Sequence, residues 1–250
     1  MIDNSYGQAA IQEKLLKALV FFDKTCRENN IYYALHGGTL LGAERNHHFI
    51  PWDDDADVSM KRSEYKKFQK VAEALPDSFE LDEQTMWVPR LIMRDDNDIV
   101  TVDILIWDYI SSNKYVQKAK ITLLRFYQGM MKKYVEYKRF GMISKVLSFI
   151  THIIGKIIPY QTKLRQFKYL CEHALTGDCR CIHRSNDNYH SIGHIYDSLF
   201  MNEYTDIEFE GYLFMINKRY HEFLERSYGT DYLALPPKEQ RIPTHEKVRR

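Results

Sequence analysis

The chain has 250 residues, of which 28% are charged and 44% hydrophobic. This balance is typical of a globular protein with a full core and excludes a disordered tail or a coiled coil. The polar start, MIDNSYGQAA, predicts no secretory signal, and four scattered cysteines do not form a disulfide scaffold. We therefore expect a soluble cytoplasmic protein.

The net charge of +1 conceals a strong asymmetry along the chain. Residues 114–168 hold ten Lys and three Arg against a single acid, Glu136, so this segment carries +12 and the remainder carries −11. A segment this basic suits phosphate-bearing partners: a nucleotide, a nucleic acid or an anionic membrane face. A solvated helical face is the alternative, and charge alone leaves the choice open.

Hydrophobic spacing predicts alternating helices and strands over the first 110 residues. In chain order we expect a helix over 8–29, a strand over 31–35, a short helix over 39–45, a strand over 55–60, a helix capped by Ser63 that ends before Pro76, and strands over 88–93 and 99–107. This interleaving indicates an α/β or α+β unit around a small mixed sheet.

The middle of the chain, residues 114–174, is predicted to be helical without strands. An apolar stripe from Ile143 to Ile157 follows the i, i+3, i+4, i+7 spacing of a core-facing helix. Because its flanks are basic, the segment 142–158 could instead lie in a membrane interface. Two lysines and a histidine interrupt it, so it does not predict a membrane-spanning helix.

In the last third we expect a strand over 207–216 and a helix that Asn217 caps and Gly229 ends. These expectations divide the chain into a catalytic core (1–110), a basic helical insertion (111–175) and a C-terminal part that completes the core (176–250).

A cluster of carboxylates precedes and enters the strand predicted over 55–60. Side chains alternate along a strand, so Asp55 and Asp57 point to one face, joined by Asp53 if the strand begins early. Adjacent carboxylates repel one another unless a cation neutralises them. An all-oxygen set of this kind suits Mg²⁺ or Mn²⁺.

A further carboxylate, Asp103, lies within the apolar strand predicted over 99–107. An aspartate there costs free energy unless it has a partner. A metal shared with Asp55 and Asp57 would supply one, in an arrangement that supports phosphoryl transfer. We expect Asp108, at the end of this strand, to be a turn residue.

Two glycines and a hydroxyl follow the first predicted strand. Gly37, Gly38 and Thr39 open a short helix, where backbone N–H groups and a hydroxyl can hold an anion. Arg45, later in that helix, could neutralise a phosphate. A second group, Cys179, Cys181 and His183, lacks the usual zinc-site spacing, and zinc binding there stays open.

These motifs together carry a resemblance to a known family. The run GGTLLGAER…FIPWDDDADV resembles the signature of the LicD family, which includes fukutin and its relatives and has a nucleotidyltransferase fold. The resemblance continues in TVDILIWD, FEG, YGTDYLALPP and His245, and covers residues 31–108 and 207–245. His48 and Ala56 depart from the family pattern, where glycine and isoleucine are usual.

The resemblance implies transfer of a phospho-alcohol, such as phosphocholine, from a cytidine-nucleotide donor to a sugar hydroxyl of a glycan or a lipid-linked glycan, with release of CMP. In this scheme Asp55 and Asp57 hold Mg²⁺ on the donor diphosphate, and Asp103 completes the metal site or accepts the proton of the acceptor. Gly37, Gly38 and Thr39 hold phosphate oxygens, with Arg45 nearby. A peripheral contact with the inner membrane face through 142–158 would suit a lipid-linked acceptor.

Two other functions share parts of this pattern. A nucleotidyltransferase that moves NMP from NTP to a small molecule or RNA would use the same glycines and carboxylates and release pyrophosphate. A non-catalytic protein could bind nucleic acid through its basic segment. Because Asp53, Asp55, Asp57 and Asp103 are all present, we favour an enzyme and do not expect a nucleic-acid partner.

Overall fold

The computed structural model describes residues 5–95, 98–132 and 151–243, which form two compact units. The first unit comprises residues 1–83, 88–107 and 199–250, and the second comprises 84–87 and 108–198. The predicted mixture of helices with a mixed sheet is confirmed. In the part of the chain that the structure describes, every helix is too short or too polar to cross a membrane.

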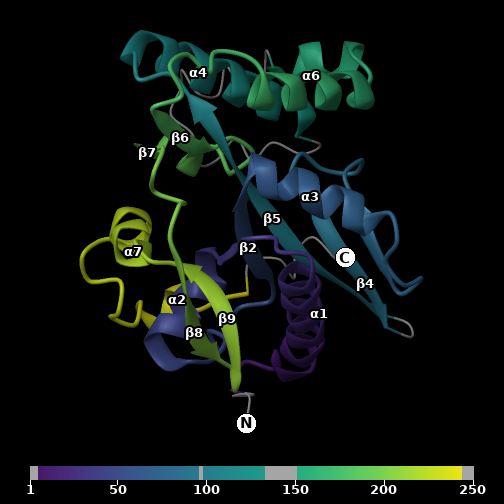
Figure 1. The fold of residues 1–250 in the computed structure, drawn as a ribbon, viewed down its shortest axis with the longest axis vertical. Helices are drawn as coiled ribbons and strands as arrows, with labels where there is room; N and C mark the ends of the chain where they lie inside the picture. The colour runs from purple at the N-terminus through teal and green to yellow at the C-terminus, as the bar shows by residue number, and fades with distance from the viewer. Residues whose placement is uncertain (1–4, 96–97, 133–150, 244–250) are drawn as a thin grey trace. The chain divides into compact units, whose positions relative to one another are not determined.

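The first unit is built on a mixed sheet with the strand order β1-β2-β5-β4-β3 (Figure 1). Its strands are β1 (Ala34–Leu35), β2 (Ala56–Lys61), β3 (Phe79–Asp82), β4 (Arg90–Asp95) and β5 (Asp98–Ile110), the last of which continues into the second unit. β2 and β5 run parallel, whereas the other neighbours on this path are antiparallel. The only parallel pair among them therefore lies at the centre of this path.

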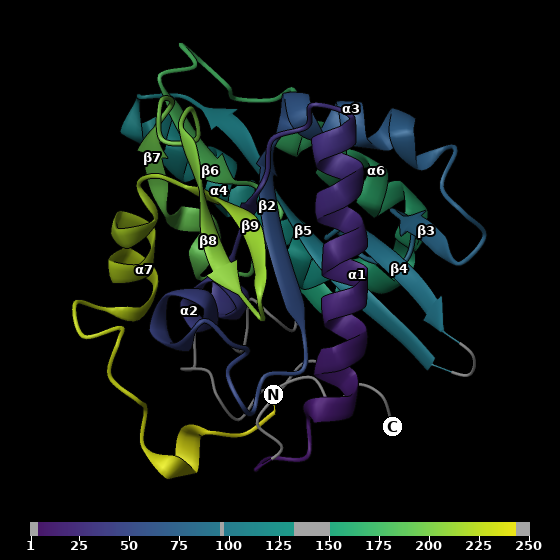
Figure 2. The same cartoon turned by 60° about the horizontal axis from the view of Figure 1, so that its bottom comes forward.

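Helices and a separate hairpin pack around this sheet (Figure 2). The helices are α1 (Ala9–Glu28), α2 (Gly37–Asn46) and α3 (Arg62–Ala72), and the hairpin consists of β8 (Tyr204–Phe209) and β9 (Tyr212–Asn217). After the hairpin the chain continues into α7 (Tyr220–Tyr228) and the short η3 (Lys238–Gln240). α1 buries Leu15, Leu19 and Phe22 and contacts β4 and β9. α2 contacts both β2 and β8, so it bridges the main sheet and the hairpin.

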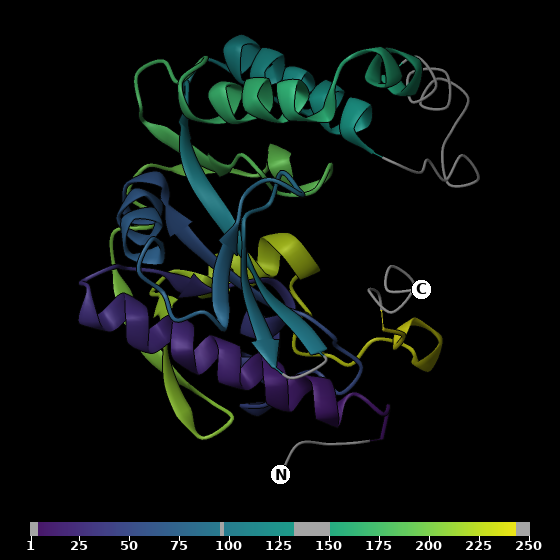
Figure 3. The same ribbon diagram turned by 90° about the vertical axis from the view of Figure 1, so that its right-hand side faces the viewer.

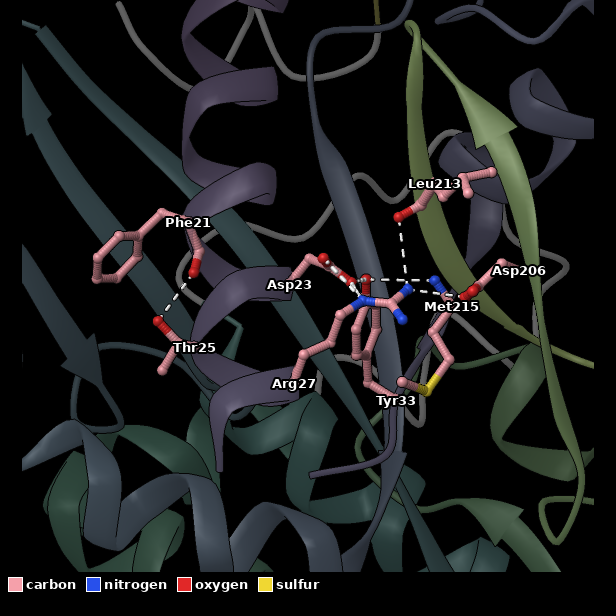
Figure 4. A network of polar contacts seen from close by, with 8 residues as sticks. All are labelled: Phe21, Asp23, Thr25, Arg27, Tyr33, Asp206, Leu213 and Met215. Carbon is pink, nitrogen blue, oxygen red and sulfur yellow. Dashed lines mark hydrogen bonds and ion pairs between the residues drawn. The ribbon is translucent and has the colours of Figure 1, made fainter. Parts of the chain in front are cut away.

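A polar network anchors the β8–β9 hairpin to α1 (Figure 4). The Arg27 guanidinium donates to the Asp206 carboxylate at 2.7 Å and to the backbone oxygen of Leu213 at 3.4 Å. The Tyr33 hydroxyl donates to Asp23 at 2.6 Å and accepts the Met215 N–H at 3.4 Å. The hairpin is thus bonded to α1 from both of its strands.

The second unit contains a pair of helices that lie side by side, α4 (Lys114–Met131) and α6 (Tyr160–Glu172) (Figure 3). Its other elements are β6 (Cys181–Arg184), η2 (Ser191–Gly193) and β7 (Ile195–Asp197), and β6 pairs with β7 in antiparallel fashion. Leu124, Leu164 and Phe167 form the centre of the apolar contact between the helices. Asn113 caps α4, because its side-chain oxygen accepts the Tyr115 N–H at 2.9 Å.

Only part of the predicted apolar stripe is described. Residues 143–150 lie outside the described residues, whereas 151–157 are helical. In this helical part Ile153 and Ile157 have exposed fractions of 46% and 78%. The described end of the stripe therefore presents two isoleucines to solvent.

Several local predictions are wrong. α3 begins at Arg62 with Lys61 before it, so Ser63 is not its cap. The strand predicted over 207–216 is two strands, because the chain reverses at Glu210 and Gly211, which both have positive φ. Strand β3 was missed, since it is short and none of its four residues is fully buried, which leaves no clear apolar pattern.

Two side chains also take other roles than those predicted. α7 begins after Arg219, so Asn217 does not cap it. The Asn217 side-chain oxygen instead accepts the N–H of Arg219, two residues further along the chain, at 2.6 Å. Asp108 is not a turn residue: it lies within β5, is 2% exposed and accepts a hydrogen bond from the Ser185 hydroxyl. The predicted end of this helix is confirmed, because Gly229 follows α7 with a φ of 91°.

Candidate functional site

The N-terminus of α2 lies directly against two of the predicted carboxylates. A Cβ on Gly37 would be less than 3.0 Å from Asp57 Oδ2, and a Cβ on Gly38 less than 3.0 Å from Asp53 Oδ2. Gly37 also has a φ of 55°, a conformation that glycine adopts at little cost. The glycine pair is therefore required by the close approach of the two aspartates.

Thr39 connects this helix start to β2. The Asp57 N–H donates to the Thr39 hydroxyl oxygen at 2.9 Å, and the His36 N–H donates to the Asp57 backbone oxygen at 2.9 Å. Thr39 is 1% exposed, so the bond is shielded from water. These two bonds hold the backbone of Asp57 beside the helix terminus, where partial positive charge favours anions.

Asp57 and Asp103 are neighbours across the parallel pair of β2 and β5. Their Cα positions are register partners, so both side chains lie on the same face of the sheet. The alternation of apolar and polar residues predicted this face for Asp103. The structure thus brings together two of the three carboxylates predicted to act in catalysis.

Arg90, which the sequence analysis did not identify, pairs with Asp103. Its Nε lies 2.9 Å from Asp103 Oδ1, and its Nη2 donates to Oδ2 at 3.3 Å. The two residues are register partners in the antiparallel pair of β4 and β5. An antiparallel register between the two predicted strands would have found this pair. Asp103 therefore has a fixed cationic partner from the protein itself.

Asp53 and Asp55 lie side by side just before β2. Their carboxyl groups are hydrogen-bonded to each other, and burial together with the Asp55 charge raises the pKa of Asp53 well above its usual range. Gln12 of α1 donates to the backbone oxygens of Ile50 and Asp53 at 3.0 and 2.9 Å. The loop that leads into β2 therefore presents a second pair of adjacent carboxyls.

Arg45 lies near the other end of α2 and is held by the C-terminal segment. Its Nη2 donates to the backbone oxygens of Tyr232 and Ala234, at 2.6 and 3.3 Å. Burial lowers the pKa of Arg45, although a guanidinium remains charged at neutral pH. In this position it joins α2 to the residues after α7, and its predicted contact with a phosphate stays a prediction.

The chemistry of these side chains fits a hard divalent cation. Asp53, Asp55, Asp57 and Asp103 offer only oxygen ligands, and the hydrogen bond between Asp53 and Asp55 shows how closely the carboxyls approach. Within the described ranges, no three His, Cys, Asp or Glu side chains are grouped so as to hold a metal by themselves. Proteins commonly bind Mg²⁺ through one or two carboxylates together with substrate phosphates, and its binding at this site stays a prediction.

Other sequence candidates lie elsewhere. His183 is fully buried, with its Nδ1 3.0 Å from the Ile192 backbone oxygen, whereas Cys179 is exposed. His245 lies outside the described residues. In the second unit a shallow groove of about 520 Å³ runs along α4 and α6 and is lined by residues that include Leu123, Tyr127 and Tyr169, none of them predicted site residues.

The sequence of this chain is similar to those of known proteins. Residues 30–143 match the family model described as LicD/FKTN/FKRP, nucleotidyltransferase domain. The lipopolysaccharide cholinephosphotransferase LicD of Haemophilus influenzae is 29% identical over 252 aligned residues, which cover 92% of each chain. An uncharacterised protein of Rickettsia typhi is 43% identical over 44 residues, or 18% of this chain and 14% of its own length. The resemblance to the LicD family is confirmed.

Proposed function

We propose that this chain, which carries the LicD-family domain at residues 30–143, is a transferase that moves a phosphocholine-like group from a CDP-activated donor to a sugar hydroxyl of a lipopolysaccharide-type glycan. The phosphorus that bears the alcohol forms a bond to the acceptor oxygen, its bond to the CMP oxygen breaks, and CMP leaves. The acceptor proton passes to a carboxylate or to water.

The observation that carries this proposal is the meeting of Asp57 and Asp103 on neighbouring strands beside the N-terminus of α2. The helix terminus attracts the donor phosphates, whereas the adjacent carboxylates attract a cation. The name of the Haemophilus relative, which aligns over nearly the whole chain, supports a choline-type donor and a lipopolysaccharide acceptor.

Each residue contributes by positioning and charge. The N–H groups of Gly38 and Thr39 at the start of α2 bind phosphate oxygens, and the two glycines let Asp57 and Asp53 approach this helix start because they lack side chains. Arg90 orients Asp103 through their ion pair. Asp103 would then either help to hold the cation or accept the proton of the acceptor hydroxyl.

Mg²⁺ or Mn²⁺ would be held by the donor phosphates together with Asp55, Asp57 and Asp103. Asp53 is a possible further ligand. When bound, the cation would supply neutralisation of the charge on the diphosphate. The close contact of Asp53 with Asp55 supports this assignment, since a cation removes the repulsion between the two groups.

A second candidate is nucleotidyl transfer, which the description of the matching domain favours. Such an enzyme would take NTP, attach NMP to its acceptor and release pyrophosphate. It would use the same phosphate cradle, formed by Gly37, Gly38 and Thr39, and the same carboxylates. The products therefore distinguish the two reactions, whereas the residues do not.

The deciding experiment measures CMP release with Mg²⁺ from CDP-choline, CDP-ethanolamine, CDP-glycerol and CDP-ribitol in separate reactions with a lipopolysaccharide acceptor. Asp57→Ala is the inactive variant, and Asp77→Ala, an exposed aspartate of a turn, is the matched control. We expect CMP from one donor, which is lost with Asp57→Ala or EDTA and retained with Asp77→Ala.

Pyrophosphate release from an NTP, without CMP from any donor, would instead establish the second candidate. Neither product, together with nucleic-acid binding that Asp57→Ala leaves unchanged, would contradict both and favour the non-catalytic alternative.

We further propose that the segment 142–158 contacts an anionic membrane, as a lipid-linked acceptor would require. Exposed Ile153 and Ile157 and the neighbouring Lys156 support this contact. In sedimentation with phosphatidylglycerol vesicles, replacing both isoleucines by Ser should reduce binding severalfold. Equal binding by the variant and the unaltered chain would contradict the contact.

A further inference from the structure

The turn of the β8–β9 hairpin holds the loop that leads to the carboxylates. Glu210 Oε1 accepts the Phe49 N–H at 2.9 Å, and Oε2 lies 3.0 Å from His48 Nδ1. The Glu210 N–H donates to the His47 backbone oxygen at 2.8 Å. Three consecutive loop residues are therefore bonded to one residue that lies 161 positions away from Phe49.

Two further contacts strengthen this attachment. His47 Nδ1 lies 3.2 Å from the Glu208 backbone oxygen, and the rings of Phe49 and Phe209 pack edge to face with centroids 4.7 Å apart. Phe49 and Phe209 are 3% and 0% exposed. The polar bonds thus lie beside a buried aromatic contact.

The backbone at Glu210 is itself unfavourable. Glu210 and Gly211 have φ values of 51° and 79°, the pattern of a two-residue hairpin turn that prefers Asn or Gly at both positions. A glutamate with positive φ is uncommon and carries a conformational cost. Because the turn does not need glutamate, its presence is explained by the carboxylate and the two bonds that it accepts.

The same loop is held from two other sides. A Cβ on Gly42 of α2 would be less than 3.0 Å from the His48 backbone oxygen, so the loop crosses directly over that helix. On the far side of the loop, Gln12 donates to the backbone oxygens of Ile50 and Asp53. The chain between His47 and Asp53 consequently has little freedom before it presents Asp53 and Asp55.

The hairpin is a firm support for this purpose. Arg27 and Tyr33 bond it to α1 at Asp206, Leu213 and Met215 (Figure 4). A turn anchored in this way can transmit the position of α1 and the hairpin to the loop. A mobile turn could not.

We infer that Glu210 is a positioning residue: its carboxylate holds the loop 47–53 so that Asp53 and Asp55 face Asp57 at the start of β2. It acts through the loop and does not touch the reacting groups. The inference deepens the proposed function, since it concerns the same site, but the geometry of the loop can be tested without any turnover.

The test is hydrogen–deuterium exchange on the full chain, followed on peptides that span residues 47–57. Glu210→Ala should raise exchange in these peptides at least about tenfold, since the bonds to Phe49 and His48 are lost. Glu210→Gln should restore most of the protection, because its amide oxygen still accepts the Phe49 N–H. Both replacements meet the same backbone cost at φ 51°, so that cost cancels between them.

Two further variants act as controls. His48→Ala removes only the ring contact and should give a smaller increase than Glu210→Ala. Glu208→Ala changes an exposed carboxylate of the same hairpin and should leave exchange unaltered. Mn²⁺ binding, measured by electron paramagnetic resonance, should weaken about tenfold in Glu210→Ala and recover in Glu210→Gln, as expected when a support of metal ligands is removed.

Unchanged exchange over 47–57 in Glu210→Ala would overturn the inference. An equal rise across the whole chain, with no recovery in Glu210→Gln, would overturn it as well, because the residue would then be only a general stabiliser. If the unaltered chain releases no CMP from any donor, the proposed function fails, while exchange and Mn²⁺ binding still decide the role of Glu210.

Discussion

Charged side chains in the two units have partners of different kinds. In the second unit Lys120, 0% exposed, donates to the backbone oxygens of Tyr109 and Cys171 at 3.0 and 2.9 Å. Lys163, 5% exposed, donates to those of Met130 and Gly155 at 3.0 and 2.5 Å. These ammonium groups join helices and strand by satisfying carbonyl oxygens within the protein.

In the first unit the carboxylates of the candidate site are half-buried and lie close to one another. Asp53 contacts Asp55, and Asp57 neighbours Asp103 across two strands. Like charges brought together cost stability unless a cation or a proton relieves them. The comparison teaches that a buried ammonium group surrounded by carbonyl oxygens serves the fold, whereas half-buried carboxylates held close to one another are suited to binding a cation.

The sharpest way to test this contrast is to remove one charge of the acidic site. We expect Asp57→Ala to lower transfer at least about a thousandfold, or about 4 kcal/mol in the activation free energy, because the cation and the donor lose a shared ligand. Its melting temperature should stay within a few degrees of the original. CMP release and calorimetry measure the two effects, and a large fall in melting temperature would break the contrast.

The reverse change belongs to the second unit. Lys120→Ala should lower the free energy of unfolding by about 3 kcal/mol, since two buried carbonyl oxygens lose their donor and a cavity remains. Urea unfolding gives this value, and Lys118→Ala on the exposed side of the same helix is the matched control. If Lys120→Ala is as stable as the control, the buried ammonium does not serve the fold.

A pH dependence should also come from the second unit. Burial lowers the pKa of His183 to about 4, below the value of 6.5 for an exposed histidine. The unfolded chain therefore binds a proton between pH 6.5 and 4 that the folded chain does not, and stability falls by up to about 3 kcal/mol as the pH drops through this window. His183→Asn, which keeps a donor for the Ile192 oxygen, should flatten the profile. Identical urea-unfolding profiles would count against this origin.

The smallest of these effects concerns the cradle. Gly38→Ala places a methyl group against Asp53 Oδ2, so Asp53 has to move. We expect transfer to fall about 10- to 100-fold, because Asp53 leaves its position in the site. Stability should change little, because the Asp53 side chain can move away from the added methyl group. Gly7→Ala, where a Cβ meets open space, is the control that adds a methyl group without a clash. Full activity in Gly38→Ala would mean that Asp53 is not needed in its present position.

Local patterns in the sequence predict part of this site. Strand alternation places Asp57 and Asp103 on one face, and the glycine pair marks the start of α2, because both are properties of a few consecutive residues. The partner of Asp103 needed an antiparallel strand register. The role of Glu210 needed contacts between distant parts of the chain, which periodicity does not contain. Strand β3, too short for a pattern, was missed for a similar reason.

The parallel pairing of β2 and β5 has a consequence for how the protein folds. These strands are separated by α3, β3 and β4, so the two aspartates meet only after a crossover has closed. Closing such a connection costs chain entropy before its contacts form, which makes parallel pairs slow to assemble. The loop before β2 waits still longer, since its support at Glu210 is made near the end of synthesis. A chain emerging from the ribosome should therefore acquire the nucleotide affinity that the proposed function requires late and abruptly, as one of its last cooperative steps.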